Sequence, residues 1–334
     1  MYKSATVAPM SRGFATPRPA SVVARIVCIV AGGLAAVQGV LIAELSTRLG
    51  GGFAGAALTN ALGGITGLMV LAVALAASPR QRRSFRFLVS RSHERRLTGW
   101  EWFATLGGLA AGIVTAWLVP LIGIGLFTVA FVGGQTIAGL AIDRIGLGPK
   151  GRIATTHLRV LGAAVCLLGV GLTLQWDKGI SASTAFVVFA FAAGVAAAFQ
   201  QAGNGRFVAL TRTLTPVLLV NFAVGACVSC VLAVVVGSWP SDASDWPTDP
   251  FLYAGPLISL TVIAVAAVAV RFLGVLVTAM LMIGGQITTS ILLDTVHSSG
   301  VGAQLLAGAA VLLIGLGLTL YASAMSTDPE EDQP

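Results

Sequence analysis

Charged residues are scarce in this chain: Asp, Glu, Lys and Arg make up 10% of its 334 residues, whereas 56% are hydrophobic. Soluble domains carry roughly 25% charged residues, so a chain this poor in charge cannot cover a water-facing surface. The sequence also lacks the alternating segments of about 10 residues that a membrane β-barrel needs. The composition therefore excludes a soluble protein and indicates an integral membrane protein built from helices.

Residues that usually carry catalysis or hold metals are few and scattered. The chain has three His residues, His93, His157 and His297, which lie in or beside loops and do not cluster, so no zinc or haem site is supported. Cys227 and Cys230 form a C-x-x-C inside an apolar run without a second pair, which favours small packing residues. No Walker A loop is present. We expect neither an enzyme nor a cofactor.

Apolar runs of about 20 residues recur along the chain, and each is long enough to cross a hydrocarbon core of ~30 Å as a helix. The 41 glycines suit close packing of helices in lipid. We expect an all-α integral membrane protein with ten transmembrane helices. The predicted ranges are 22–43, 54–77, 101–120, 123–142, 157–175, 184–205, 214–237, 251–270, 272–293 and 302–324.

The predicted helices form two units of five, at residues 22–175 and 184–324. The first unit contains a basic loop, 78–100, that the second lacks. An N-terminal tail, 1–21, and an acidic C-terminal tail, 325–334, are polar, contain Pro and have no periodicity, so we expect them to be disordered.

The basic residues favour one orientation in the membrane. With the N-terminus in the cytoplasm, 18 of the 20 Lys and Arg residues fall on the cytoplasmic side, and only Arg48 and Lys178 fall outside. Cytoplasmic loops carry this excess in multi-pass proteins. The net charge of +7 is therefore assigned to topology and to anionic lipid headgroups, not to nucleic acid. We expect both termini to be cytoplasmic.

The two units repeat each other in sequence. "GGQTIAGLAID" at 133–143 returns as "GGQITTSILLD" at 284–294, and "GAAV" begins matching segments at Gly162 and Gly308. Weaker matches pair Gln38 with Gln200 and Asn60 with Asn221. Because five is odd, the second unit begins on the opposite side of the membrane, which predicts inverted-topology repeats. Such repeats hold substrate near the midplane at their interface.

These motifs resemble the YdcZ-like five-helix inner-membrane family of the drug/metabolite transporter superfamily. The resemblance rests on Gln38 and on Gly134-Gln135 followed by Asp143-Arg144-Ile145-Gly146. The second copy keeps Gln200, Asn204, Gly285-Gln286 and Asp294. The chain departs from the pattern at Ile42, where an Asn would stand, and after Asp294, where "TVHSSG" follows. The resemblance implies a ten-helix carrier of a bacterial inner membrane, formed by fusion of two five-helix units, and no particular substrate.

Polar residues inside the apolar runs are the candidate site, because each must be satisfied there or face water. Amides can bind a zwitterion, a sugar, a nucleobase or a carboxylate. The alternative is hydrogen bonding between helices, worth roughly 0.6 kcal/mol on average, and it is favoured for the two Asn residues. Aromatic residues near the ends of the predicted helices are expected to anchor at the interface, whereas Trp117 lies deeper and is a candidate to line the outer half of a cavity. The candidate substrate-binding residues are Gln38, Gln135, Gln200, Gln286, Asn60, Asn221 and Trp117.

Charged residues within the predicted helices point away from proton-coupled chemistry. Asp143 and Asp294 fall at helix ends, where each is expected to pair with a basic loop residue or to tie down a helix end. For Arg206, snorkelling to headgroups is favoured over attraction of an anionic substrate. No Asp, Glu or Lys lies at mid-membrane, which argues against proton antiport of multidrug cations.

The sequence thus predicts a secondary transporter that moves a small polar or amphipathic metabolite by alternating access. The cavity would be lined by the first, fourth, sixth and ninth predicted helices. A non-transporting membrane scaffold or accessory subunit is the alternative. The expected partners are a small-molecule substrate and membrane lipid, with no nucleic acid, and the chain is expected to act as a monomer or homodimer.

Overall fold

The structure is a computed structural model, in which ten α-helices and one short 3-10 helix, and no strand, are found among the residues that it describes. Those residues are 18–79, 82, 99–148, 151–152, 156–173, 182–211, 215–237, 239, 246–273, 275–297 and 302–325. The helices are α1 (Arg18–Arg48), α2 (Gly52–Ala77), α4 (Gly99–Ile122), α5 (Ile124–Ile145), α6 (His157–Leu172), α7 (Ala182–Thr211), α8 (Thr215–Val235), η3 (Pro250–Ala254), α9 (Gly255–Leu273), α10 (Val275–His297) and α11 (Ala303–Met325). The prediction of an all-helical membrane protein is confirmed.

Every predicted apolar run corresponds to one of these helices. Among the described residues, seven helices are long and apolar enough to cross a membrane: α1, α2, α4, α5, α7, α8 and α11. Three further apolar stretches, His157–Leu172, Pro250–Ala266 and Met280–Val296, are shorter. The predicted loop 78–100 and both predicted tails lie largely outside the described residues, although α1 already begins at Arg18.

Helix α5 begins and ends at glycines whose backbone conformation other residues rarely adopt. Gly123, with φ of 79°, alone separates α4 from α5 and allows the chain to reverse there. At the other end Gly146 is left-handed, with φ of 80°, and its N–H donates to the carbonyl oxygen of Ile142. These two glycines fix the length of the helix that carries the first GGQ motif.

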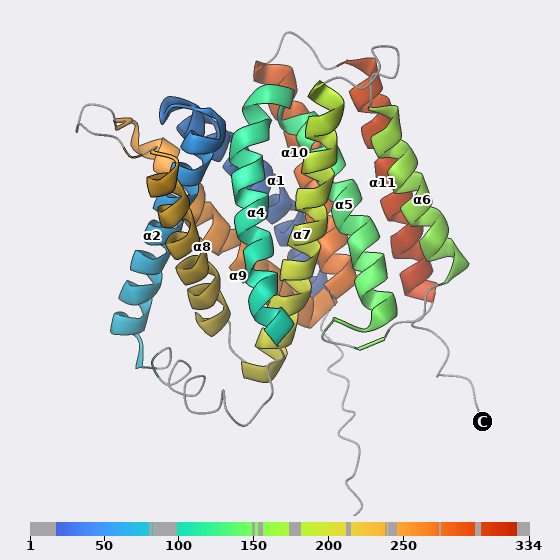
Figure 1. Ribbon diagram of the computed structural model, residues 1–334. Coiled ribbons are helices and arrows are strands. Elements are labelled where there is room, and N and C mark those ends of the chain that lie inside the picture. Colours follow the sequence, from blue (N-terminus) through green and yellow to red (C-terminus); the bar gives the residue numbers. More distant parts are fainter. Residues whose placement is uncertain are drawn as a thin grey trace, which may run out of the picture.

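The largest group of buried apolar residues surrounds α5. Phe127, Val129 and Val132 of α5 lie in it with Ile287 of α10 and Leu312 of α11. In the apolar stretch of α5, 61% of the residues are buried, which is the highest share among the seven described helices that are long enough to cross a membrane. Helix α5 is therefore the most buried of these helices, and it contacts α1, α4, α6, α7, α10 and α11 (Figure 1).

Two pairs of helices that match each other in sequence, α6 with α11 and α2 with α8, pack side by side. In Figure 1, α6 and α11 form one edge of the molecule, and α2 and α8 lie together at the opposite edge. In the first pair Gly162 faces Gly315, whereas Gly169, further along α6, faces Gly308, which is earlier in α11. The two helices of this pair therefore run antiparallel, and a glycine from each helix lies at both of these contacts.

The first helix of each unit packs against the fourth helix of the other unit. A Cβ added to Gly134 of α5 would clash with the carbonyl oxygen of Phe191 in α7, and one added to Gly194 of α7 would clash with that of Phe131 in α5. Such reciprocal contact means that the two backbones touch, which only residues without a side chain permit.

The same contact occurs between α1 and α10. A Cβ added to Gly32 would meet the backbone of Met282, and one added to Gly285 would meet the backbone of Ile29. Gly285 belongs to the second GGQ motif, as Gly134 belongs to the first. Both motifs thus place their second glycine at a close helix crossing, and the Gln follows immediately.

Candidate functional site

A chain of three amides joins α7 to α8. Gln200 Nε2 of α7 donates to Asn221 Oδ1 of α8 at 3.0 Å, and Asn221 Nδ2 donates to Asn204 Oδ1 of α7 at 2.9 Å. Asn221 Nδ2 also donates to the carbonyl oxygen of Val217, one turn earlier in its own helix, at 2.8 Å. All three amides are half-buried. The structure therefore brings together two of the predicted site residues, Gln200 and Asn221, with Asn204.

Helix α4 makes room for these amides by lacking side chains at two positions. A Cβ at Gly108 would clash with the amide group of Gln200, and a Cβ at Gly112 would clash with Asn60 Oδ1 of α2. The two glycines lie four residues apart, on one face of the middle of α4. Gln200 and Asn60, which come from different units of the chain, thus approach α4 at neighbouring turns.

Gln38, the sequence counterpart of Gln200, has a different partner. Its Nε2 donates to Ser259 Oγ of α9 at 2.6 Å, so it joins α1 to α9. Asn60, the counterpart of Asn221, donates to the carbonyl oxygen of Ala56 in its own helix at 2.9 Å. Ile42 occupies the place that corresponds to Asn204. The first unit therefore has no counterpart of the three-amide chain among the described residues.

The glutamines of the two GGQ motifs are half-buried on α5 and α10. Neither the Gln135 nor the Gln286 side chain forms a hydrogen bond with any residue that the structure describes. Their backbones lie next to the glycine crossings, because the main-chain nitrogen of Gln135 would be 3.1 Å from a Cβ at Gly194. Their role in binding a substrate stays a prediction.

Trp117 lies in a group of aromatic rings near the C-terminal end of α4. Its ring centroid is 6.2 Å from that of Phe53 on α2, and 6.4 and 6.0 Å from those of Phe186 and Phe189 on α7. Phe53 and Phe189 are exposed, with 40% and 49% of their surface accessible. Edge-on and tilted ring contacts of this kind stabilise packing between helices. Whether Trp117 also lines a cavity stays a prediction.

The two aspartates act at helix ends, as the sequence predicted. Asp294, near the end of α10, accepts hydrogen bonds from the backbone N–H groups of Ile124 at 3.2 Å and Gly125 at 2.7 Å, at the start of α5. A carboxylate at a helix N-terminus satisfies free N–H groups and complements the helix dipole. Asp143 Oδ2, at the other end of α5, lies 3.8 Å from Arg159 Nη1 of α6, whose side chain is buried.

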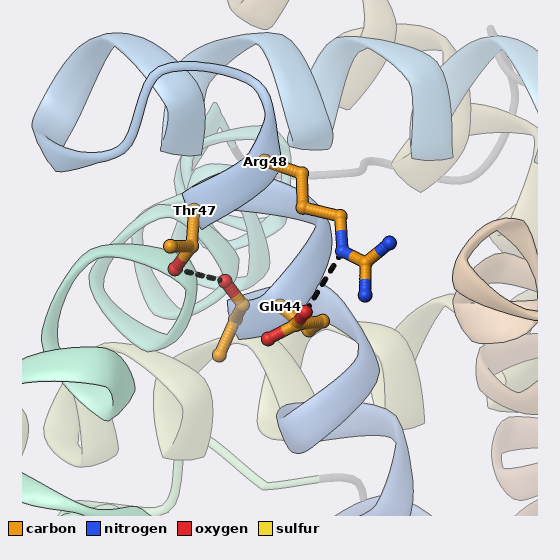
Figure 2. Close-up of polar contacts among 4 residues, drawn as sticks. Glu44, Thr47 and Arg48 are labelled. Carbon is orange, nitrogen blue, oxygen red and sulfur yellow. Dashed lines mark hydrogen bonds and ion pairs between the residues drawn. The ribbon is translucent and has the colours of Figure 1, made fainter. Parts of the chain in front are cut away.

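Two arginines lie near helix ends in different settings. Arg206 of α7 stacks over Trp100 at the start of α4, with 5.5 Å between its guanidinium carbon and the ring centroid. Arg48 Nε donates to Glu44 Oε1 at 2.8 Å, four residues back in α1, and about half of each side chain is exposed. Figure 2 shows this ion pair beside the hydrogen bond from Thr47 Oγ1 to the carbonyl oxygen of Ala43.

Three features of this region were not among the predicted site residues. Asn204 entered the sequence analysis only through a family resemblance, and Ser259 is an ordinary residue of an apolar run. Gly108 and Gly112 read from sequence as a small-x-x-x-small packing motif. The same four-residue spacing of glycines occurs whether they face the backbone of a neighbouring helix or a polar side chain. The sequence therefore does not indicate that polar side chains from α2 and α7 occupy the space beside Gly108 and Gly112.

Comparison with known proteins gives the family of the chain. No curated protein matches its sequence. A family model described as "Putative inner membrane exporter, YdcZ" matches residues 23–172 and again residues 185–320. The two matches coincide with the two predicted five-helix units, so the resemblance predicted from the GGQ motifs and Gln38 is confirmed. The chain therefore belongs to the YdcZ family of inner membrane exporters, carries two copies of the family unit, and is a membrane transporter.

Proposed function

We propose that the protein is a secondary transporter that exports a small polar or amphipathic metabolite by alternating access between two inverted five-helix halves. The observation that carries the proposal is the antiparallel packing of α6 on α11 through Gly162, Gly169, Gly308 and Gly315. These are the fifth helices of the two sequence repeats. Equivalent helices that run antiparallel at a shared contact are what a two-fold axis in the membrane plane requires.

The contacts of α1, α5, α7 and α10 support the same symmetry. The crossing of Gly134 with Gly194 and that of Gly285 with Gly32 are formed by equivalent residues of the two repeats. Each half therefore holds the first helix of the other half against its own fourth helix. The α5–α7 pair and the α1–α10 pair make the same contacts. A state open to one side of the membrane and a state open to the other can therefore have similar free energies, which is the physical basis of alternating access.

In this proposal the helices cross the membrane ten times, with both chain ends in the cytoplasm. The excess of Lys and Arg on one side supports this orientation. The substrate would contact the Gln residues of α1, α5, α7 and α10. Gln135 and Gln286 are suited to that role, since their amides are half-buried and make no hydrogen bond within the described part of the chain. An amide in an apolar setting gains free energy when a ligand provides partners.

The inverted topology can be tested with two single-cysteine variants, His157→Cys and Gln304→Cys. Both exposed residues lie in the first turn of their helices, α6 and α11, which are equivalent in the two repeats. A membrane-impermeant maleimide should label Gln304→Cys in intact cells and His157→Cys only after the cells are opened. Labelling of both from the same side would contradict the inverted arrangement.

Transport can be tested with purified protein in proteoliposomes loaded with a metabolite extract and supplied with no ATP. Mass spectrometry of the external medium should show one class of solute released faster than from protein-free liposomes. Release equal to that from protein-free liposomes, under imposed ion gradients of either sign, would favour a membrane protein that does not transport.

A further inference from the structure

The two repeats can be compared residue by residue, because their contacts keep the register of the sequence alignment. Gly32 of α1 crosses the backbone of Met282 in α10, and its equivalent, Gly194 of α7, crosses that of Phe131 in α5. If the two halves had the same conformation, equivalent residues would be equally buried. A difference in burial between equivalents therefore shows which end of the molecule is closed and which is open.

Gly39 of α1 is packed, whereas its equivalent in α7, Gln201, is not. The alignment that pairs the glutamines of these two helices also pairs the residues that follow them. Gly39 is buried, and a Cβ there would lie 2.9 Å from Ile124 Cδ1 of α5 and 3.7 Å from Thr115 Cγ2 of α4. Gln201 is exposed. The contact that closes one end of the molecule is therefore missing at the equivalent place in the other half.

The exposed amide of Gln201 faces the interior of the helix bundle. Ala190, Ala197 and Gln201 are seven and four residues apart, which places them on one face of α7. Ala190 is 0% exposed and Ala197 is 5% exposed, so other helices cover this face until it reaches Gln201. The Gln201 side chain makes no hydrogen bond with any described residue. Because an amide facing hydrocarbon would stay unsatisfied, water must reach it.

A second pair of equivalents, Ser290 of α10 and Gly139 of α5, differs in the same way. Ser290 is fully buried, whereas a Cβ added to Gly139 would meet no described atom within 4 Å. Gly139 shares one face of α5 with Gln135 and with Thr128 and Val132, which are both fully buried. This face of α5 is therefore closed in the first half of the helix and open in the second half.

The packing of whole helices shows the same difference between the units. In the first unit α1 packs against α4 and α5, and α2 packs against α4. Of the equivalent pairs in the second unit, neither α7 with α9 or α10 nor α8 with α9 packs closely among the described residues. Gly39 and Ser290 lie toward the end of the molecule where α4 is followed by α5, which is the outer end in the proposed orientation. Gln201 and Gly139 lie toward the cytoplasmic end.

Asp294 connects the two units at the closed end. Its carboxylate accepts hydrogen bonds from the backbone N–H groups of Ile124 and Gly125, which holds α10 of the second unit against α5 of the first. Asp294 lies four residues after Ser290, on the same face of α10. A path from the interior to the outer side cannot form between α5 and α10 until these two hydrogen bonds break.

We propose that the structure is the state open to the cytoplasm, that Asp294 and the first turn of α5 form the outer gate of the transport path, and that Gln201 and Gly139 line its cytoplasmic entrance. This inference rests on the proposed export function. In the opposite state the equivalents exchange surroundings. Gln201 then packs against Ala266 of α9, the equivalent of Thr115, while α10 separates from the start of α5.

The test uses single-cysteine variants in which the native Cys28, Cys166, Cys227 and Cys230 are replaced by Ala. The variants Gln201→Cys and Ser290→Cys are treated with a methanethiosulfonate that carries a trimethylammonium and does not cross membranes, in right-side-out and in inside-out vesicles. Gln201→Cys should react in inside-out vesicles, and Ser290→Cys in neither kind. Adding Asp294→Ala should raise the rate of Ser290→Cys in right-side-out vesicles about five- to thirtyfold, because loss of two backbone hydrogen bonds shifts the population toward the outward-open state by roughly that factor.

The matched control replaces Asp294→Ala by Thr295→Ala, a change at the exposed neighbouring residue, which should leave Ser290→Cys unreactive. Complete labelling of each variant after denaturation shows that its thiol is intact. Thermal midpoints show that the Asp294→Ala protein is folded at the labelling temperature. Gly139→Cys is a second reporter of the cytoplasmic entrance if Gln201→Cys is not recovered in folded form, and Gly39→Cys replaces Ser290→Cys in the same way.

The exchange between states can be tested with two pairs of cysteines at equivalent positions. Gly39→Cys with Thr115→Cys should form a disulfide in the present state, and Gln201→Cys with Ala266→Cys should form one in the opposite state. Each disulfide should stop solute release from proteoliposomes, and a reducing agent should restore it, because transport requires both states. Failure of the second pair to oxidise would contradict the exchange.

Three labelling results would overturn the assignment of the gate and the entrance. Reaction of Ser290→Cys in right-side-out vesicles while Asp294 is intact would mean that the outer end is open. Absence of reaction at both Gln201→Cys and Gly139→Cys in inside-out vesicles would mean that the cytoplasmic end is closed. An unreactive Ser290→Cys after Asp294→Ala would remove Asp294 from the gate. Failure of the export function itself would show differently, as absence of solute release by the unmodified protein in proteoliposomes.

Discussion

Asp294 Oδ2 accepts a hydrogen bond of 2.7 Å from the backbone N–H of Gly125. The contact connects the end of α10 to the start of α5, the most buried of the seven long apolar helices, across 169 residues of chain. The other carboxylate oxygen accepts from Ile124 at 3.2 Å. Asp294 therefore provides, from another helix, the N-terminal cap that Gly123 cannot supply with a side chain of its own.

Removal of this cap should destabilise the protein. Asp294→Ala leaves two N–H groups at the start of α5 without their acceptor, and we expect a loss of about 1–2 kcal/mol. The thermal unfolding midpoint in detergent measures the effect, with the exposed neighbour Thr295→Ala as the control. Equal midpoints for the two variants would show that the cap adds nothing to stability.

The glycine crossings should tolerate no methyl group. Gly134→Ala and Gly285→Ala each place a Cβ against the backbone of a neighbouring helix, so we expect lower yields of folded protein and lower unfolding midpoints. Gly139→Ala and Gly284→Ala are matched controls on the same two helices, since a Cβ there meets no atom within 4 Å. Size-exclusion profiles and midpoints compare the four. Similar behaviour of test and control variants would mean that the helices can separate at no cost.

The glutamines of the GGQ motifs should matter for transport more than for folding. Gln135→Leu and Gln286→Leu retain volume and remove the amide, so each should lower export several-fold while the protein still inserts and purifies normally. The loss of polar contacts to substrate is the physical reason, because neither amide has a described hydrogen-bond partner to lose. Unchanged transport kinetics in both variants would remove these residues from the site.

The two equivalent asparagines should differ in effect. Asn221→Ala deprives Gln200 and Asn204 of their shared partner, whereas Asn60→Ala removes a bond only to its own helix. We expect Asn221→Ala to lower export at least about tenfold and the unfolding free energy by about 1–2 kcal/mol, with a smaller stability loss for Asn60→Ala. Efflux from proteoliposomes and thermal midpoints check both values. A larger stability loss for Asn60→Ala would reverse this ranking.

The ion pair of Arg48 and Glu44 should contribute little to stability. Both side chains are about half exposed, and ion pairs in such settings are worth roughly 0–1 kcal/mol. Arg48→Ala should therefore shift the unfolding midpoint by no more than a degree or two, and added salt should make this shift smaller still. A shift as large as that of Asp294→Ala would contradict a weak, solvent-exposed ion pair.

Much of the architecture could be predicted from composition and repetition. Long apolar runs specify helices in a membrane because lipid offers no partners to an open backbone, and each run corresponds to a helix in the structure. The repeat of GGQ at 133–135 and 284–286 led to the family that the comparison confirms. The predicted helix boundaries were less accurate than the predicted number of helices, because α1 and α7 extend beyond their apolar parts into polar residues.

The site was predicted only in part. The sequence pairs Gln38 with Gln200 by position, and nothing local separates the two residues. Their surroundings differ because Gln38 meets Ser259, 221 residues away, while Gln200 meets Asn221, 21 residues away. The aspartates could be placed correctly because their position at helix ends is a local property, and Asp294 does hold the start of α5.

The sequence by itself determined the class of the protein, its helices, its internal duplication and its family, because hydrophobic length and repetition are properties of the chain alone. Only the tertiary structure decided which helices pack together, and hence which amides satisfy each other. The physical reason is that an amide in an apolar environment takes the nearest available partner, and nearness depends on how α2, α4, α7 and α8 pack.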